Sequence, residues 1–325
     1  MTRNPRRRSG FTLIELLVVI SLIILLASLT VGAVFRVLGA RRETNTNTHL
    51  LKIDLALSQM YKSKLDLIKK EPVPLAIIEM TRNQGSVPGL PGTQDMDRAR
   101  AFHLKMRLRE EFPQNFGDVG IPGTPSYNIT FNGTQYQYRG KATYQSALKN
   151  PQRIPPASGN FVELEAEAQS AACLVLILSQ GAGGATIDPE TIGPTKLMSY
   201  PQQDGSTLQL RVFIDAFGKH IAFRRLADDD MFDALNELNQ PPFVGSGAAD
   251  PQDPARRLGN LPPWPGYASL RSVLAQPNPG MRPYIVDPFD GRNRGPFAFS
   301  AGKDSNFITQ DDLYSFRVQQ SGRGN

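Results

Sequence analysis

The sequence predicts an α+β fold in which one long N-terminal helix precedes a head built on an antiparallel sheet. Three observations support this prediction. The run from Leu16 to Phe35 is twenty uncharged residues, rich in Leu, Ile and Val. Apolar residues then recur every three or four positions up to Ile68, as on one face of a helix. Further along, short alternating segments are separated by turn-forming dipeptides, which is typical of antiparallel strands.

Composition is that of a folded protein with a weakly basic balance. The 325 residues are 40% hydrophobic, which is enough to bury a core. Four of the six excess positive charges are Arg3, Arg6, Arg7 and Arg8, which leaves +2 for the rest and argues against nucleic acid as a partner. The single cysteine, Cys173, excludes an internal disulfide and a multi-cysteine metal cluster. We expect it to be a small buried residue.

The uncharged run is long enough to cross a membrane, since about 20 helical residues span about 30 Å of hydrocarbon. A secretory signal peptide has a shorter apolar region of about 7 to 15 residues, although "VGA" at 31–33 resembles its cleavage site. Arginines lie on both sides, with Arg36, Arg41 and Arg42 after the run. The denser cluster before it favours a cytoplasmic N-terminus. We therefore predict a transmembrane helix half over residues 11–38.

Glu15 stands at the start of this apolar segment. An ionisable side chain inside a bilayer costs about 2.5 to 3.5 kcal/mol on insertion scales, so it needs a partner. The alternative is that Glu15 lies near the helix end and extends its carboxylate toward the headgroups.

The stretch "RRRSGFTLIELLVVI", residues 6–20, resembles the prepilin N-terminal signature of type IV pilins and type II secretion pseudopilins. The resemblance implies a leader peptide at 1–10, cleavage between Gly10 and Phe11 by a prepilin peptidase, and N-methylation of Phe11. Glu15 then becomes the fifth residue of the mature chain, with an assembly or registry role. Its carboxylate would pair with the Phe11 amine of a neighbouring subunit, and paired charges tolerate burial better than single ones.

The helix is expected to continue beyond the membrane segment. The bridge "ARRETNTNT" contains no proline or glycine, and Pro72 with Pro74 ends the apolar periodicity. We predict one helix over residues 11–69, with an amphipathic half at 39–71 and an α+β head at 72–325.

Within the head, sequence patterns predict several further elements. The first are a charged helix over 96–112 that carries His103 on its surface, a hairpin over 127–138 turning at Asn132-Gly133, and a helix over 161–180. Two strands within 208–226, joined by Asp-Ala-Phe-Gly, follow. A proline-rich insertion is expected at about 239–283, and further strands in the closing stretch. His220 begins the second strand of 208–226, with no neighbouring His or Cys to complete a zinc site.

An acidic loop near the C-terminus is a candidate calcium site. "SAGKDSNFITQDDLYSF", 300–316, resembles the C-terminal loop of major type II secretion pseudopilins, which implies Asp304 as first ligand and one or both of Asp311 and Asp312 as later ligands. Ser305 and Phe307 stand where that family usually has glycine. The spacing excludes an EF-hand. The alternative is a solvated loop in which aspartates form turns.

Catalytic motifs are absent from the sequence: there is no G-x-S-x-G, H-E-x-x-H or P-loop, and a lone Ser-x-x-Lys match at 146–149 lacks companions. We therefore expect a structural subunit, not an enzyme, with calcium as the sole candidate cofactor; a membrane-anchored hydrolase is the less favoured alternative. Another alternative is a minor subunit whose head binds DNA, a surface or secretion cargo, for which the proline-rich insertion is the candidate contact.

The resemblance also implies partners and a location. The expected partners are a prepilin peptidase, other pilin or pseudopilin subunits and an inner-membrane assembly platform. The expected location is the bacterial inner membrane, with a single pass, a cytoplasmic N-terminus and a periplasmic head, followed by an extracytoplasmic filament. Pilus, secretion pseudopilus and DNA-uptake filament all stay open.

Overall fold

The computed structural model describes residues 13–82, 92–116, 118–119, 128–131, 134–137, 140–147, 166–181, 186–201, 207–225, 253, 257–258, 296–307 and 311–315. The chain divides into two compact units, residues 1–45 and 46–325. Each is considered by itself below.

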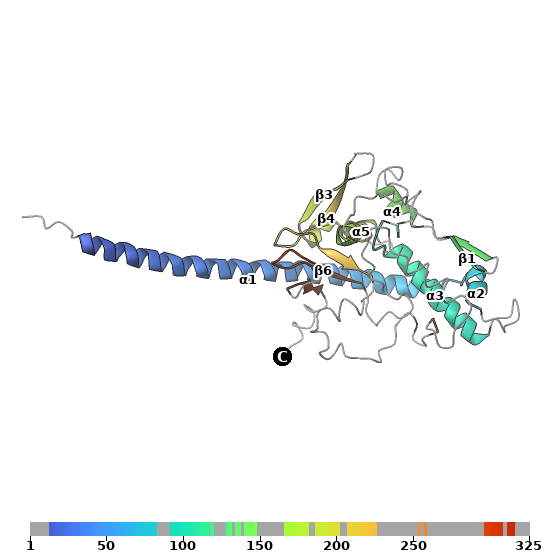
Figure 1. Cartoon of the computed structure of the whole chain (residues 1–325). Coiled ribbons are helices and arrows are strands. Elements are labelled where there is room, and N and C mark those ends of the chain that lie inside the picture. Colours follow the sequence, from blue (N-terminus) through green and yellow to red (C-terminus); the bar gives the residue numbers. More distant parts are fainter. Residues whose placement is uncertain are drawn as a thin grey trace, which may run out of the picture. The chain divides into compact units, whose positions relative to one another are not determined.

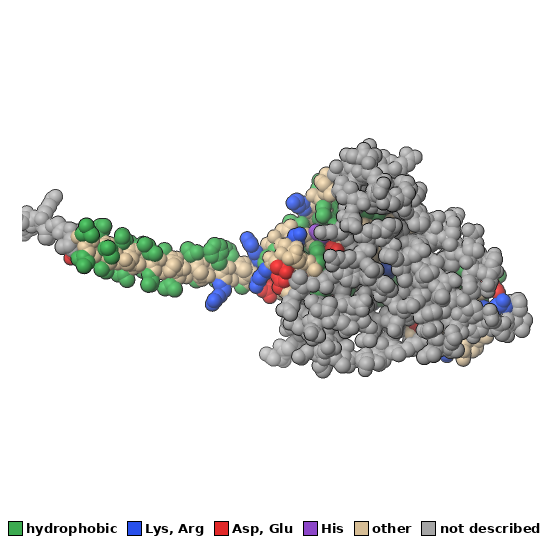
Figure 2. Space-filling model, in the orientation of Figure 1, with side chains coloured by type: hydrophobic (Ala, Val, Ile, Leu, Met, Phe, Trp, Pro, Cys, Tyr) green, Lys and Arg blue, Asp and Glu red, His purple; other side chains and the backbone are tan. Residues whose placement is uncertain are grey.

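Helix α1, Leu13–Ile68, confirms the predicted long helix (Figure 1). It runs without a break through the polar bridge, and it closes where the N–H of Lys69 bonds the carbonyl of Leu65 at 3.1 Å, just before Pro72. Every large apolar side chain from Leu13 to Leu38 is exposed, and Figure 2 shows this green surface along the helix. By length and composition this helix can cross a membrane.

The remaining helices belong to the head. They are α2 Leu75–Thr81, α3 Thr93–Glu111, α4 Ala142–Ala147, α5 Ala166–Gln180 and α6 Pro189–Ile192. Helix α3 confirms the predicted charged helix and begins at Thr93 instead of residue 96. Helix α5 ends at Gln180, as predicted. Gly181 follows with a φ of 73°, a conformation that glycine adopts without strain and that ends many helices. Helix α2 was not expected so soon after Pro72 and Pro74.

The described strands form three small antiparallel sheets. Strand β1, Asn128–Phe131, pairs with β2, Thr134–Gln137, which confirms the predicted hairpin; its turn residues lie outside the described part. Strand β3, Thr195–Pro201, pairs with β4, Thr207–Phe213. Strands β5, Ala222–Arg224, β6, Phe297–Ser300, and β7, Leu313–Tyr314, form the third sheet in the order β5-β6-β7.

The predicted strand pair in 208–226 is confirmed as β4 and β5, but the two strands belong to different sheets. The turn between them holds Gly218 at a φ of 92°, where a side chain would be strained. Outside the named strands, the two segments are joined by a bridge between Ile214 and His220. The chain therefore changes sheets at this turn.

Helix α5 lies at the centre of the core and is buried on several faces. Leu174, Ile177 and Leu178 belong to a first cluster with the second half of α1, whose buried members include Leu50, Ile53, Leu57 and Met60. Ala171, Ala172 and Cys173 belong to a second cluster, with side chains of β3 and β4. The expectation that Cys173 is buried is confirmed.

Three residues of the proline-rich insertion are described, Asp253, Arg257 and Leu258, and Arg257 contacts α3. The side chain of Arg98, 2% exposed, donates to the carbonyls of Arg257 at 3.1 Å and Thr81 at 2.8 Å. Asp253 accepts hydrogen bonds from the N–H groups of Arg257 and Leu258. The rest of 239–283 lies outside the described residues.

Candidate functional site: the N-terminal helix, the head network and the acidic loop

Glu15 lies in the first turn of α1 and is exposed. The start of a helix favours a carboxylate there, because its unpaired N–H groups carry partial positive charge. In the same segment, the hydroxyl of Ser21 donates to the carbonyl of Leu17, and that of Ser28 to the carbonyl of Leu25, both at 2.8 Å. These two hydroxyls are therefore satisfied within the helix, and Glu15 is the acidic side chain of its first turn.

Gly10 and Phe11 precede the described residues, which begin at Leu13. Cleavage between them and methylation of Phe11 stay predictions. In the structure, helix α1 begins at Leu13, within three residues of the predicted cleavage point.

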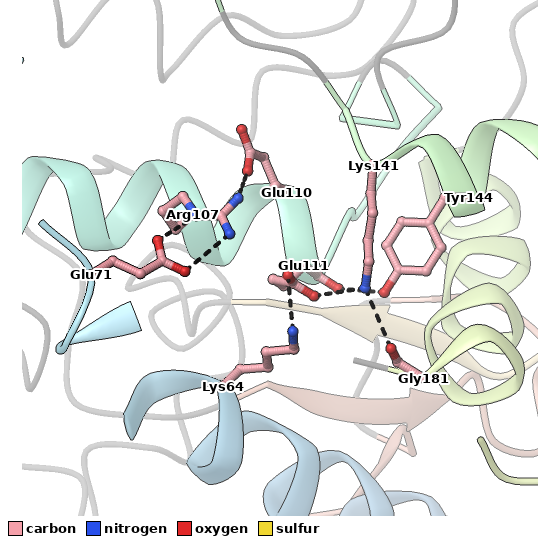
Figure 3. Close-up of polar contacts among 8 residues, drawn as sticks. All are labelled: Lys64, Glu71, Arg107, Glu110, Glu111, Lys141, Tyr144 and Gly181. Carbon is pink, nitrogen blue, oxygen red and sulfur yellow. Dashed lines mark hydrogen bonds and ion pairs between the residues drawn. The ribbon is translucent and has the colours of Figure 1, made fainter. Parts of the chain in front are cut away.

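A polar network joins several elements of the head through Glu111, the last residue of α3 (Figure 3). Its carboxylate accepts from Lys64 of α1 at 3.1 Å and from Lys141 at 2.9 Å. The Tyr144 hydroxyl of α4 donates to the Glu111 carbonyl at 2.8 Å, and Lys141 also donates to Gly181 beyond α5 at 3.4 Å. These contacts fix helices to one another, which indicates a structural role.

His103 is buried, so the prediction that it lies on the surface is wrong. Its Nε2 lies 3.5 Å from a carboxylate oxygen of Glu71, which also accepts from Nε of Arg107 at 2.9 Å. Burial lowers the pKa of His103, against the opposing effect of Glu71. Burial raises the pKa of Glu110, although Arg107 contacts it. No sequence pattern revealed this cluster, because its members come from two separate segments.

Asp118 is a second buried charge that the sequence did not reveal. It is 1% exposed and accepts from Nε of Arg109 at 2.5 Å and from Nη1 of Arg225 at 3.0 Å. The N–H of Gln114 donates to the same carboxylate at 3.0 Å. Burial alone would raise the pKa of Asp118, but the two arginines lower it. The carboxylate is therefore charged and links three segments.

In the described part of the acidic loop, the side chain of Asp311 binds backbone N–H groups of the segment after β6. Its Oδ2 accepts from the N–H groups of Lys303 at 2.6 Å and Asp304 at 3.0 Å. Gly302, at a φ of 65°, leaves no room for a side chain, because a Cβ there would lie 2.2 Å from the Asp311 carbonyl oxygen. Ser305 also has a positive φ, of 60°.

The three predicted calcium ligands do not share one environment. Asp304 is exposed, Asp311 is half-buried, and Asp312 is buried with its carboxylate accepting from the Tyr314 hydroxyl at 3.2 Å. Among the residues that the structure describes, no group of three or more His, Cys, Asp or Glu side chains could hold a metal ion. Calcium binding through these aspartates together with loop carbonyls stays a prediction.

The remaining candidate side chains lie in the interior. His220 packs on Phe307, with ring centroids 5.1 Å apart, and burial lowers its pKa to about 4. Burial raises the pKa of the Cys173 thiol, so the unreactive protonated form is favoured. Asp54 of α1 accepts from the Ser315 hydroxyl at 2.6 Å, which ties α1 to the segment after β7.

One comparison with known proteins gives a match. Residues 5–31 match the family model of the prokaryotic N-terminal methylation motif. No curated protein and no solved structure matches the chain. The matched residues include Gly10, Phe11 and Glu15 and most of the apolar segment of α1, up to Val31. The chain therefore carries the signature of type IV pilins and pseudopilins at the start of an α+β, pilin-like layout.

Proposed function

We propose that this chain is a structural subunit of a type IV pilus-like or type II secretion pseudopilus filament, cut between Gly10 and Phe11 and assembled through α1. The carrying observation is Glu15, a charged side chain exposed on the first turn of an apolar helix inside the matched motif. Its proposed partner is the methylated amine of Phe11 on a second subunit. The assembly platform and the peptidase act on the membrane-inserted form.

The energetic argument is that a lone subunit holds an unfavourable carboxylate at the edge of the hydrocarbon, where its cost approaches the value of about 2.5 to 3.5 kcal/mol for a helix centre as the side chain moves inward. Pairing with an amine in the low-dielectric interior of a filament offsets that cost. The pair also fixes how far one helix is shifted along its neighbour. Assembly is then favoured only in one register.

Glu15→Ala tests this proposal, with Ser28→Ala as matched control. Both substitutions remove a polar group from the exposed apolar segment, but Ser28 carries a neutral hydroxyl that bonds its own helix, whereas Glu15 carries the carboxyl group that the proposed pair requires. The full chain is expressed with its assembly machinery, and membrane and sheared filament fractions are quantified. Glu15→Ala is expected to reach the membrane normally and to be depleted at least tenfold from filaments, while Ser28→Ala assembles. Normal assembly of Glu15→Ala would reject the proposal.

A further inference from the structure

Three arginines follow the apolar segment of α1, and their arrangement differs from that of a protein-binding stripe. Arg36, Arg41 and Arg42 all lie on α1 and are all exposed. We propose that they form an arginine collar that binds the anionic phosphate headgroups of the membrane surrounding the helix. This function is separate from filament assembly and applies to the chain while it resides in a bilayer.

The position along the helix fits one headgroup layer. Residues 16–35 span about 30 Å, which equals the hydrocarbon thickness, so Arg36 begins where the hydrocarbon ends. Arg42 lies about 9 Å further along the axis. The headgroup region of one leaflet is about 5 to 8 Å thick, and flexible arginine stems let the charged ends adjust toward it. All three guanidinium groups can therefore reach the same layer.

The position around the helix is the stronger argument. At about 100° per residue, the three side chains are separated by angles of about 140°, 100° and 120°. Figure 2 shows blue side chains on opposite sides of the helix where the green apolar surface ends. A protein partner approaches a helix from one side and would need a one-sided stripe. Lipids surround the helix, so charges directed all around it fit lipid.

The net charge of this segment and the hydrogen-bonding geometry of its guanidinium groups both favour an anionic phosphate as the ligand. Glu43 is the only acidic residue between Leu16 and Thr48, so the segment from Arg36 to Glu43 carries a net charge of +2. Guanidinium groups bind phosphate oxygens through two parallel hydrogen bonds. One basic residue near an anionic surface strengthens association about fivefold. A preference of at least fivefold for anionic over zwitterionic lipid is therefore expected for the collar at low salt.

The test uses the full chain in nanodiscs containing equal amounts of phosphatidylglycerol and phosphatidylcholine. Lipids retained after mild detergent treatment are counted by native mass spectrometry. The variants are Arg36→Gln, Arg41→Gln and Arg42→Gln, singly and combined, and glutamine preserves helix propensity. Leader arginines are common to all samples, so their contribution cancels in the comparison. The matched control replaces Lys52, Lys62 and Lys69, which are also exposed, by glutamine.

The expected result is that phosphatidylglycerol enrichment is at least fivefold higher on the wild-type chain than on the triple arginine variant, and that each single variant loses a similar part of this difference. The lysine control keeps the full preference. An unchanged preference in the triple arginine variant, or an equal loss in the lysine control, would overturn the proposal. So would a loss confined to one arginine, since that pattern indicates a one-sided partner such as a carboxylate of a second copy.

Discussion

The two halves of α1 use the same residue types against different surroundings. Leu22, in the first half, is 56% exposed, whereas Leu57, in the second half, is fully buried in the core of the head. Acidic side chains are also placed differently in the first half of α1 and in the head. The first half exposes the carboxylate of Glu15 on an apolar surface, while the head buries the carboxylate of Asp118 between two arginines.

The comparison shows what each half requires in order to be stable. In the described part of the head, charge pairs such as Arg109–Asp118 and the apolar clusters around α5 form within one chain. The first half leaves its apolar surface open, and that surface is suited to hydrocarbon or to other helices. A substitution in the head should therefore change unfolding, and one in the first half should change membrane residence or assembly.

The largest effect is expected from Asp118→Ala. Removing this carboxylate leaves Arg109 and Arg225 without their shared buried partner, and breaking a buried pair costs about 3 to 5 kcal/mol. Urea unfolding of the full chain in detergent micelles measures the loss. The matched control is Glu190→Ala, which breaks the solvent-exposed pair with Arg211 and should cost less than about 1 kcal/mol. Equal effects of the two substitutions would contradict the structural role of Asp118.

A matched pair of leucine truncations separates the two halves directly. Leu57→Ala should destabilise the head by about 3 kcal/mol, because it removes buried methyl groups and leaves a cavity. Leu22→Ala should leave the urea midpoint of the head unchanged. A similar shift of the midpoint in both variants would show that the halves are not energetically distinct.

His220 gives the stability of the head a pH dependence. Its pKa is about 4 in the folded head, against 6.5 for an unperturbed histidine. The unfolded chain therefore binds the proton first, and stability is full above pH 6.5 and falls as the pH drops toward 4. Between pH 7.5 and 5.0 this amounts to about 2 kcal/mol. His220→Phe should remove that part of the loss in urea unfolding; an unchanged pH dependence would contradict the assignment.

The smallest expected effect concerns the acidic loop. If the loop binds calcium, millimolar Ca²⁺ should raise the head's melting temperature by a few degrees relative to chelator, since a ligand bound only by the folded state stabilises it. Asp304→Asn should abolish this shift, and Asp66→Asn, another exposed aspartate, should retain it. Identical melting temperatures with Ca²⁺ and with chelator would contradict calcium binding and leave Asp311 with its backbone contacts alone.

Local patterns predicted much of this fold. The apolar spacing up to Ile68, followed by Pro72, predicted α1. Alternation around Asn132-Gly133 predicted the β1–β2 hairpin, and the apolar stretch "SAACLVLIL" predicted that Cys173 is buried. Each depends on residues close together in the chain, so hydrophobic periodicity and turn chemistry suffice.

The buried polar contacts could not be predicted in the same way. Asp118 and Arg225 are 107 residues apart in the chain, and Asp54 and Ser315 are 261 apart. His103 was expected on the surface because its helix is highly charged, but it is buried beside Glu71, a residue from another segment of the chain. Such pairings depend on tertiary folding, which one sequence does not reveal.

Processing at Gly10 is the most direct test of an N-terminal helix built for assembly. The full chain is produced with a prepilin peptidase in a bacterial membrane, and its N-terminus is identified by mass spectrometry of the intact protein. We predict a chain that begins at Phe11 and carries one added methyl group. A chain that retains residues before Phe11, or one cut after Ala33 like a secreted protein, would contradict the assignment.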